Sequence, residues 1–260
     1  MRHVKSTVAR VFEWLAPGLW LRSRIRRRDR NFEREYFFIA DLCDSQRLSI
    51  DAGGNVGEFA FWMSYHSRRV ISYEPNPICQ RRIRRILRPN ITLRPAALSD
   101  APGSASLLFP EDNLGLGSIA AGNPIFGHAG KSGYAAITVP TVRLDEDVTE
   151  PVGLIKIDVE GHEATVLDGA TALLARDRPR IMIEIEERHG AGAHHQVRRR
   201  LEPSGYRRFI LCSTGLMPLD WEADAAVLQA APAESPDYVN NFIFIHRDDP
   251  YLDGLRDGSR

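Results

Sequence analysis

The sequence is poor in cysteine and lysine and has no excess of either charge. Its three cysteines, Cys43, Cys79 and Cys212, lie far apart without a Cys-x-x-Cys pair, which excludes a zinc-finger pattern and a disulfide framework and favours a reducing, cytoplasmic setting. The 34 basic and 34 acidic residues cancel, so no net field favours nucleic acid and none is expected as a partner. No apolar run approaches the about 18 residues that cross a bilayer.

Positive charge gathers at the N-terminus. Residues 1–30 hold nine Lys or Arg against Glu13 and Asp29, a surplus of seven that residues 31–260 balance. The apolar stretch 11–21 is interrupted and no small-residue cleavage site follows it, so we expect no secretory signal. The cluster Arg22–Arg30 favours a solvated face. Neighbouring Trp14 and Trp20 leave open a peripheral membrane contact through residues 1–30.

Length and hydrophobic pattern predict one α/β domain with additions at its ends. A chain of 260 residues, 43% hydrophobic and 26% charged, suits a single folded unit. Near-helical spacing of apolar and aromatic residues predicts helices over 5–15, 20–30 and 31–43. We therefore expect a helical extension over 1–45, the main domain over 46–250 and a tail over 251–260.

From residue 47 short β-branched runs alternate with helical stretches. This alternation predicts βαβ units with right-handed crossovers, and hence a parallel sheet covered on both faces. Residues 213–238 are expected to form a loop, and the glycine-rich segment 115–133 a mobile cover over a site. The predicted strands are 48–52, 70–74, 91–97, 104–109, 136–144, 152–158, 180–185, 206–212 and 239–246. The predicted helices are 56–66, 77–87, 161–175 and 193–202.

The densest motif is Asp-Ala-Gly-Gly-Asn-Val-Gly at residues 51–57, at the end of the first main-domain strand and directly before a helix. Glycines there permit positive φ and close approach of a ligand, while the helix start offers unpaired N–H groups. A pyrophosphate binder would show Gly-x-Gly-x-x-Gly spacing instead. Because an acid at a strand end suits an ammonium group, Asp51 indicates a cationic amino-acid moiety.

Glu74 ends the second main-domain strand, 23 residues after Asp51. An acid at this place is positioned to accept hydrogen bonds from ribose hydroxyls. Together, Asp51 and Glu74 favour a cofactor that carries a nucleoside.

Two further strands end in paired acids. Asp158 and Glu160 follow one strand, Glu184 and Glu186 the next, and all should gather at the carboxyl edge of a parallel sheet. Crowded carboxylates raise one another's pKa unless a cation lies among them. That cation is a sulfonium cofactor, a divalent metal or Arg188, and the sequence leaves the three open. Glu160 also suits the start of the following helix.

These motifs together resemble the FkbM family of S-adenosylmethionine-dependent methyltransferases. The residues that carry the resemblance are IDAGGNVGEFA (50–60), ISYEPNP (71–77), AALSD (96–100), TVRLDE (141–146), LIKIDVEGHEATVLDGA (154–170), IMIEIEERH (181–189) and the final NNFIFIH. The resemblance implies a Rossmann-like class I methyltransferase fold: a seven-stranded, mostly parallel sheet whose last strand is antiparallel, with helices on both faces and an N-terminal helical extension outside it.

The resemblance also assigns a cofactor site. The turn would hold the methionine part of S-adenosylmethionine, Glu74 the ribose and the segment 97–100 the adenine. The family commonly has Ala where this chain has Gly54. The predicted cofactor-binding residues are Asp51, Gly53, Gly54, Asn55, Gly57, Glu74, Asn76, Ala97, Leu98, Ser99 and Asp158.

Methyl transfer to a hydroxyl requires in-line alignment and removal of a proton. His189 is the first candidate base, oriented by Glu184 or Glu186, and Asp158 and Glu160 follow it. No metal is predicted, and Mg²⁺ on Asp158 and Glu184 is the weaker alternative. The remaining candidates, His162, His194 and His195, are expected to be peripheral.

The sequence therefore predicts O-methylation of a hydroxyl on a small molecule or glycan. A nicotinamide-dependent Rossmann oxidoreductase is one alternative, since it shares the strand–turn–helix and Glu74 but should show a third spaced glycine. A non-catalytic binding module that uses the basic segment Arg22–Arg30 is the other. Neither alternative accounts for the acids at the strand ends.

Overall fold

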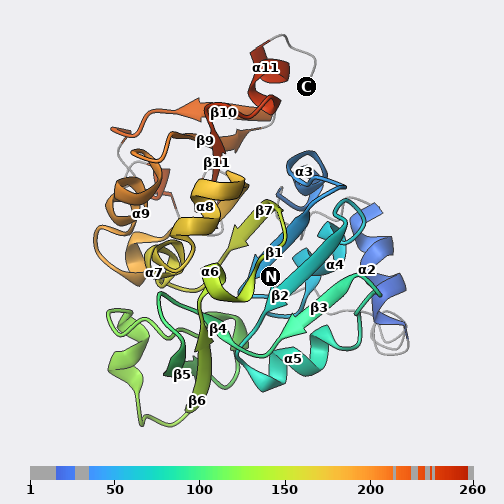
Figure 1. Cartoon of the computed structure of the whole chain (residues 1–260). Coiled ribbons are helices and arrows are strands. Elements are labelled where there is room, and N and C mark those ends of the chain that lie inside the picture. The colour runs from blue at the N-terminus through green and yellow to red at the C-terminus, as the bar shows by residue number, and fades with distance from the viewer. Residues whose placement is uncertain are drawn as a thin grey trace.

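The computed structural model describes residues 16–26, 35–212, 215–223, 228–231, 235 and 238–256. Within them a central sheet has eight strands in the order β10-β9-β11-β8-β7-β1-β2-β3 (Figure 1). The strands from β3 to β8 in that order run parallel, whereas β11 is antiparallel to both β8 and β9, and β10 to β9. The strands are β1 Leu48–Ala52, β2 Arg69–Tyr73, β3 Ile91–Arg94, β7 Val152–Ile157, β8 Arg180–Glu184, β9 Tyr206–Cys212, β10 Gly215–Leu219 and β11 Asn241–His246.

The central strands are buried along their whole length. Every residue of β1, β7 and β11 is buried, as expected for strands covered on both faces. Side chains alternate between two hydrophobic clusters: Ile50 and Ile155 belong to one, and Val70 and Leu154 to the other. A one-residue slip would exchange these faces, so the burial pattern fixes the register.

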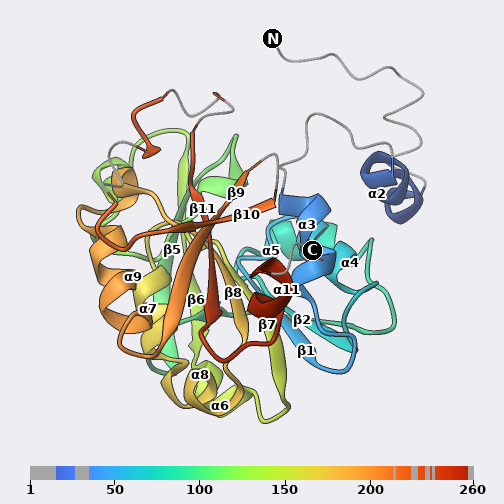
Figure 2. The ribbon, with the colours of Figure 1, turned by 90° about the horizontal axis from the view of Figure 1, so that it is seen from above.

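Helices cover the two faces separately. Figure 2 shows α6 (Leu144–Asp147), α7 (Glu163–Asp168), α8 (Thr171–Asp177) and α9 (Ala193–Leu201) on one side of the sheet. The opposite side carries α2 (Pro17–Arg26), α3 (Glu35–Leu42), α4 (Glu58–Met63), α5 (Pro77–Ile83) and α11 (Tyr251–Arg256). The first group packs on the larger cluster and most of the second group on the other.

A second, three-stranded sheet interrupts the βα alternation between β3 and β7. It has the order β4-β6-β5, with β4 Ala97–Leu98, β5 Gly103–Pro110 and β6 Tyr134–Val142. The glycine-rich segment between β5 and β6, expected as a loop, contains two short 3₁₀ helices, η1 Leu114–Leu116 and η2 Pro124–His128. This small sheet supplies one wall of the candidate site.

Three of the expected elements differ in the structure. The single helix expected over 161–175 is divided into α7 and α8. The central sheet has eight strands among the described residues and not seven, because β10 lies in the segment 213–238 expected as a loop. Gly215 and Pro218 hide this strand in the sequence, but a proline is tolerated on an edge strand. The strand expected over 91–97 is divided at Pro95: its first part is β3 and its last residue begins β4.

The ends of the chain are partly described. α2 and α3 pack through Leu21 and Ile39 on the same cluster as Leu252 of α11, which lies in the segment expected as a tail. The helix expected over 5–15 and much of the cluster Arg22–Arg30 lie outside the described residues. No helix of the described part is both long and apolar enough to span a bilayer.

Candidate active site

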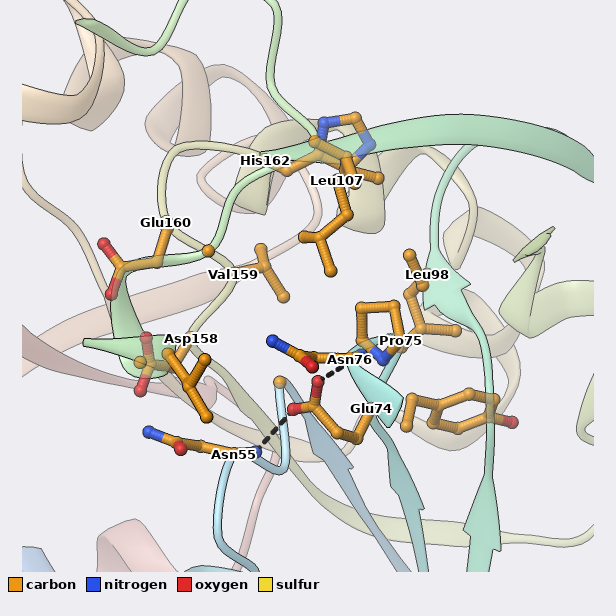
Figure 3. Close-up of a pocket in the computed structure, with 17 residues that line it drawn as sticks. Asn55, Glu74, Pro75, Asn76, Leu98, Leu107, Asp158, Val159, Glu160 and His162 are labelled. Atoms are coloured by element: carbon orange, nitrogen blue, oxygen red, sulfur yellow. Dashed lines mark hydrogen bonds between the residues drawn. The ribbon is translucent and has the colours of Figure 1, made fainter. Parts of the chain in front are cut away.

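A cavity of about 610 Å³, open to solvent, lies where β1, β2 and β7 end (Figure 3). The small sheet and η1 form the wall opposite these strand ends. The residues that line the cavity are Gly53, Asn55, Tyr73, Glu74, Pro75, Asn76, Ala97, Leu98, Leu107, Leu114, Gly115, Gly117, Ile119, Asp158, Val159, Glu160 and His162.

The turn after β1 requires glycine at Gly53 and Gly57. Both have positive φ, 82° and 84°. A Cβ on Gly53 would lie 1.8 Å from the carbonyl oxygen of Asp158, and one on Gly57 would lie 2.9 Å from Ile86 Cδ1. The first glycine thus lets β1 and β7 end side by side at the cavity, while the second lets α4 begin close to α5.

Asp51, predicted to hold the methionine part of the cofactor, lies beneath this turn and does not line the cavity. Its side chain is fully buried, and its Oδ2 accepts a hydrogen bond from Ser72 Oγ at 3.0 Å. Burial raises its pKa, while the nearby Lys156 ammonium opposes that rise. Gly54 also lies outside the cavity, and a Cβ on it would lie 2.2 Å from Ser72 Oγ. Asp51, Gly54 and Gly57 therefore shape the turn from outside the cavity.

Glu74 projects into the cavity with both carboxylate oxygens held by backbone N–H groups (Figure 3). Oε2 accepts from Asn55 N at 2.6 Å and Oε1 from Asn76 N at 2.7 Å. Burial nevertheless raises its pKa to about 7. Each oxygen keeps a further lone pair, so the carboxylate can accept hydrogen bonds from two ligand hydroxyls.

Asn76 connects this corner to α5. Its Oδ1 accepts from Ile78 N at 2.9 Å and caps the helix, whereas its buried Nδ2 has no partner among the described residues. Because an unpaired buried donor is costly, a ligand acceptor in the cavity would satisfy this group.

The wall opposite the strand ends is apolar except for one histidine. Ala97, Leu98 and Leu107 line it, as does His162, which was expected to be peripheral. Ser99, a predicted adenine contact, does not line the cavity; its Oγ lies 3.1 Å from His162 Nε2. In the sequence, the one indication that His162 lies near the cavity is its position four residues after Asp158, at the end of β7.

Asp158 and Glu160 follow β7 and line the cavity side by side (Figure 3). Asp158 Oδ2 accepts from the buried Lys156 ammonium at 2.9 Å. Glu160 has the left-handed backbone conformation, φ 54°, and burial raises the pKa of its carboxyl to about 8, with Asp158 adding to the rise.

The segment between β5 and β6 holds Glu160 in this strained conformation. Ser118 Oγ and Asn123 Nδ2 both donate to the carbonyl oxygen of Glu160, at 2.6 and 2.7 Å. Gly115 lies against the Asn55 side chain, where a Cβ would be 2.9 Å from Nδ2. The segment expected as a mobile cover therefore lies over the site, hydrogen bonded to Glu160 at one end and packed closely on Asn55 at the other; its mobility stays a prediction.

His189, the first candidate base, stands behind Glu160 and does not line the cavity. Its Nε2 lies 3.1 Å from Glu160 Oε2, and both side chains are 12% exposed. Burial lowers the His189 pKa, so the ring is held neutral. The expected orienting acids bind other groups: Glu184 accepts from Asn240 Nδ2 at 2.8 Å, and Glu186 pairs with Arg188. The group that faces the cavity is thus Glu160.

The weaker alternative of a magnesium site gains no support. Among the residues that the structure describes, no three or more His, Cys, Asp or Glu side chains form a group able to hold a metal ion. Asp158 is engaged by Lys156, and Glu184 by Asn240.

Solved structures share this fold at low sequence identity. A methyltransferase FkbM from Methylobacillus flagellatus KT matches with a TM-score of 0.50 and 14% identity over 91% of this chain, which spans about half (52%) of that protein. A putative methyltransferase from Streptococcus mutans, solved in complex with SAH, matches with a TM-score of 0.44 and 12% identity over 82% of this chain and 98% of its own. No curated protein matches the sequence.

A family model decides the assignment. The model of the methyltransferase FkbM domain matches residues 51–208, which include the turn after β1, the whole cavity lining and the strand-end acids. The fold agrees, since the neighbouring structure has the Rossmann-like class I architecture with a mostly parallel sheet. The chain belongs to the FkbM family of methyltransferases.

Proposed function

We propose that this protein transfers a methyl group from S-adenosylmethionine to a hydroxyl of a small molecule or glycan. The observation that carries the proposal is the cavity itself, with Glu74 at one end and Glu160 at the other. One carboxylate is fixed by backbone donors, and the other has a pKa raised into the range useful for proton transfer.

The residues present fit this cofactor. Glu74 offers two acceptors to the ribose hydroxyls. Pro75, Leu98 and Leu107 form an apolar surface on which the adenine ring can pack. The unpaired Asn76 Nδ2 can donate a hydrogen bond to a nitrogen of that ring. Asp158 places negative charge beside the cavity for the positively charged part of the cofactor.

Glu160 is the proposed general base. When bound, S-adenosylmethionine supplies a methyl carbon made electrophilic by the adjacent sulfonium. The chain must then orient the acceptor and take its proton. Glu160 lines the cavity, and its raised pKa of about 8 makes its carboxylate a better base than an ordinary glutamate.

His189 is proposed as a positioning residue that acts through Glu160. Its neutral Nε2 lies 3.1 Å from Glu160 Oε2, so a hydrogen bond between them can hold the Glu160 carboxyl in place at the cavity. The base also favours oxygen as the acceptor atom, because a hydroxyl must lose its proton as it is methylated, whereas a neutral amine can attack before it does so.

Two measurements test the proposal. Calorimetric titration with S-adenosylhomocysteine should show one site per chain, and Glu74→Ala should weaken it. Radiolabelled methyl transfer should then be followed over a panel of sugars, glycosides and small alcohols, with the matching amines in parallel. Absence of cofactor binding contradicts the whole proposal, whereas methylation of amines alone contradicts only the hydroxyl acceptor.

A further inference from the structure

The turn-rich segment from α5 to β3 is strongly basic. Residues 77–90 contain five arginines and no acid. Cys79, Ile83 and Ile86 are buried, while Arg81, Arg82, Arg84 and Arg85 are all exposed. The protein therefore concentrates positive charge on one face even though its net charge is zero.

This surface continues onto α2. Arg22 and Arg88 both lie against the ring of Tyr65, with guanidinium carbons 5.5 and 3.6 Å from its centroid. Arg22 is exposed, and Leu19, three residues earlier on the same helical face, is 61% exposed. We call the surface formed by α2, α5 and residues 84–88 the basic face.

Four arginines of the basic face lack the ion pairs that several arginines elsewhere in the described residues form. Arg198 forms ion pairs with Glu202 and Glu222, and Arg200 with Asp168. In contrast, Arg22, Arg81, Arg82 and Arg84 form no ion pair with any residue that the structure describes. Unneutralised charge of this kind can attract an anionic partner.

Exposed aliphatic side chains lie among these charges. Leu87, next to Arg88, is 41% exposed, and Ile78 at the start of α5 is 38% exposed. None of the large apolar side chains exposed in the described part of the chain is aromatic, so rings on which single-stranded bases could stack are not among them. Arginines combined with aliphatic side chains suit a lipid surface, where the charges meet headgroups and the apolar groups enter the interface.

We propose that the basic face docks the protein onto an anionic membrane surface. The sequence extends the pattern, since six of the nine residues from Arg22 to Arg30 are arginine. Asn76, which caps the N-terminus of α5, also lines the cofactor cavity, so docking would hold the cavity near the lipid headgroups. This proposal does not depend on methyl transfer.

The test is co-sedimentation of the full chain with vesicles. Phosphatidylcholine vesicles that contain phosphatidylglycerol should bind the protein, and vesicles of phosphatidylcholine alone should not. The triple variant Arg81→Gln/Arg82→Gln/Arg84→Gln should bind about 100-fold more weakly, at about fivefold for each charge. Added salt should weaken the wild type, because these charges are exposed.

The matched control is Arg199→Gln/Arg207→Gln/Arg247→Gln, which removes the same charge from exposed arginines outside the basic face. It should keep most of the vesicle binding. A second variant, Leu19→Gln/Leu87→Gln, should bind about tenfold more weakly without losing charge. Titration with S-adenosylhomocysteine verifies that each variant is folded and tests the cofactor site separately.

Equal losses in the two arginine triples would overturn the proposal, as would equal binding to neutral and anionic vesicles. Binding of a single-stranded RNA oligonucleotide without any vesicle binding would overturn it in favour of nucleic acid. Selective loss in the basic-face triple supports it whether or not methyl transfer is found.

Discussion

The two ends of the cavity use the same side chain in opposite ways. Glu74 is buried and Glu160 is largely covered, and burial raises the pKa of the first to about 7 and of the second to about 8. Glu74 receives two backbone N–H donors, which oppose the rise. The Glu160 carboxylate instead contacts the His189 ring, while its backbone is held in a strained conformation.

This difference separates binding from proton transfer. Backbone donors keep a carboxylate in one place as a fixed acceptor, which suits recognition of hydroxyls. A carboxyl without such donors, beside a neutral imidazole, can gain and lose a proton at little cost. Variants of Glu160 should therefore lose turnover, whereas variants of Glu74 should lose affinity for the cofactor.

The largest effect is expected for Glu160→Gln. It removes the base while keeping shape, so kcat should fall at least about 100-fold while affinity for S-adenosylhomocysteine stays within about threefold. Initial rates of methyl transfer and calorimetry measure the two quantities. Glu163→Gln is the matched control, because Glu163 is buried nearby without lining the cavity and a Gln oxygen can still accept from Gly161 N. A full rate in Glu160→Gln would remove Glu160 from the mechanism.

Glu74→Ala should give the reverse pattern. It removes the ribose acceptors and leaves Asn55 N and Asn76 N unpaired, so cofactor affinity should fall about 50-fold, or about 2 kcal/mol. Glu74→Gln keeps one acceptor and should lose less. Titration with S-adenosylhomocysteine measures both variants. Unchanged affinity in Glu74→Ala would place the cofactor elsewhere.

The pH profile of kcat/KM should report Glu160. A base must be deprotonated, so the rate should rise about tenfold per pH unit below its pKa of about 8 and level off above it. Glu160→Gln should lack this dependence. A profile that falls as pH rises through 8 would contradict the assignment of Glu160 as base.

His189→Gln should lower kcat about tenfold with KM for the cofactor unchanged, because Gln can hydrogen bond to Glu160 but holds its carboxyl in a different position. His195→Gln, at an exposed histidine, is the control. Loss of cofactor affinity in place of turnover would indicate a purely structural role.

The smallest effect concerns stability. The folded state holds the Glu160 proton up to a pKa of about 8, whereas the unfolded chain releases it near the ordinary value of 4.5, so this group lowers the free energy of unfolding as pH rises between the two. Glu160→Gln removes this loss and should be about 1 kcal/mol more stable at pH 8 but not at pH 4. Chemical denaturation at both values measures it, and equal differences would contradict the raised pKa.

Local patterns predicted most of the parallel sheet and one end of the site. β1, β2, β7 and β8 are short β-branched runs bounded by turn residues, and Glu74 is found at a strand end as expected. β10 was not predicted because glycine and proline usually interrupt a strand, whereas an edge strand tolerates them. The cofactor role of each residue stays a prediction.

The other end of the site could not be predicted from spacing alone. The sequence makes His189 the first candidate base, but which of His189 and Glu160 faces the cavity depends on how η3, Glu187–His189, packs behind the turn after β7. The orientation of Asp51 could not be predicted either. Its position at the end of β1 suggested a ligand contact, but its side chain lies under the turn and accepts a hydrogen bond from Ser72.

The sequence by itself determined the strand ends, the glycine turn and the set of acids at one edge of the sheet, because periodicity and turn chemistry are local properties. Only the tertiary structure decided which acids enter the cavity, which are held by backbone donors and which have raised pKa values. Those properties depend on burial and on partners far apart along the chain, such as Glu160 with Ser118 and His189.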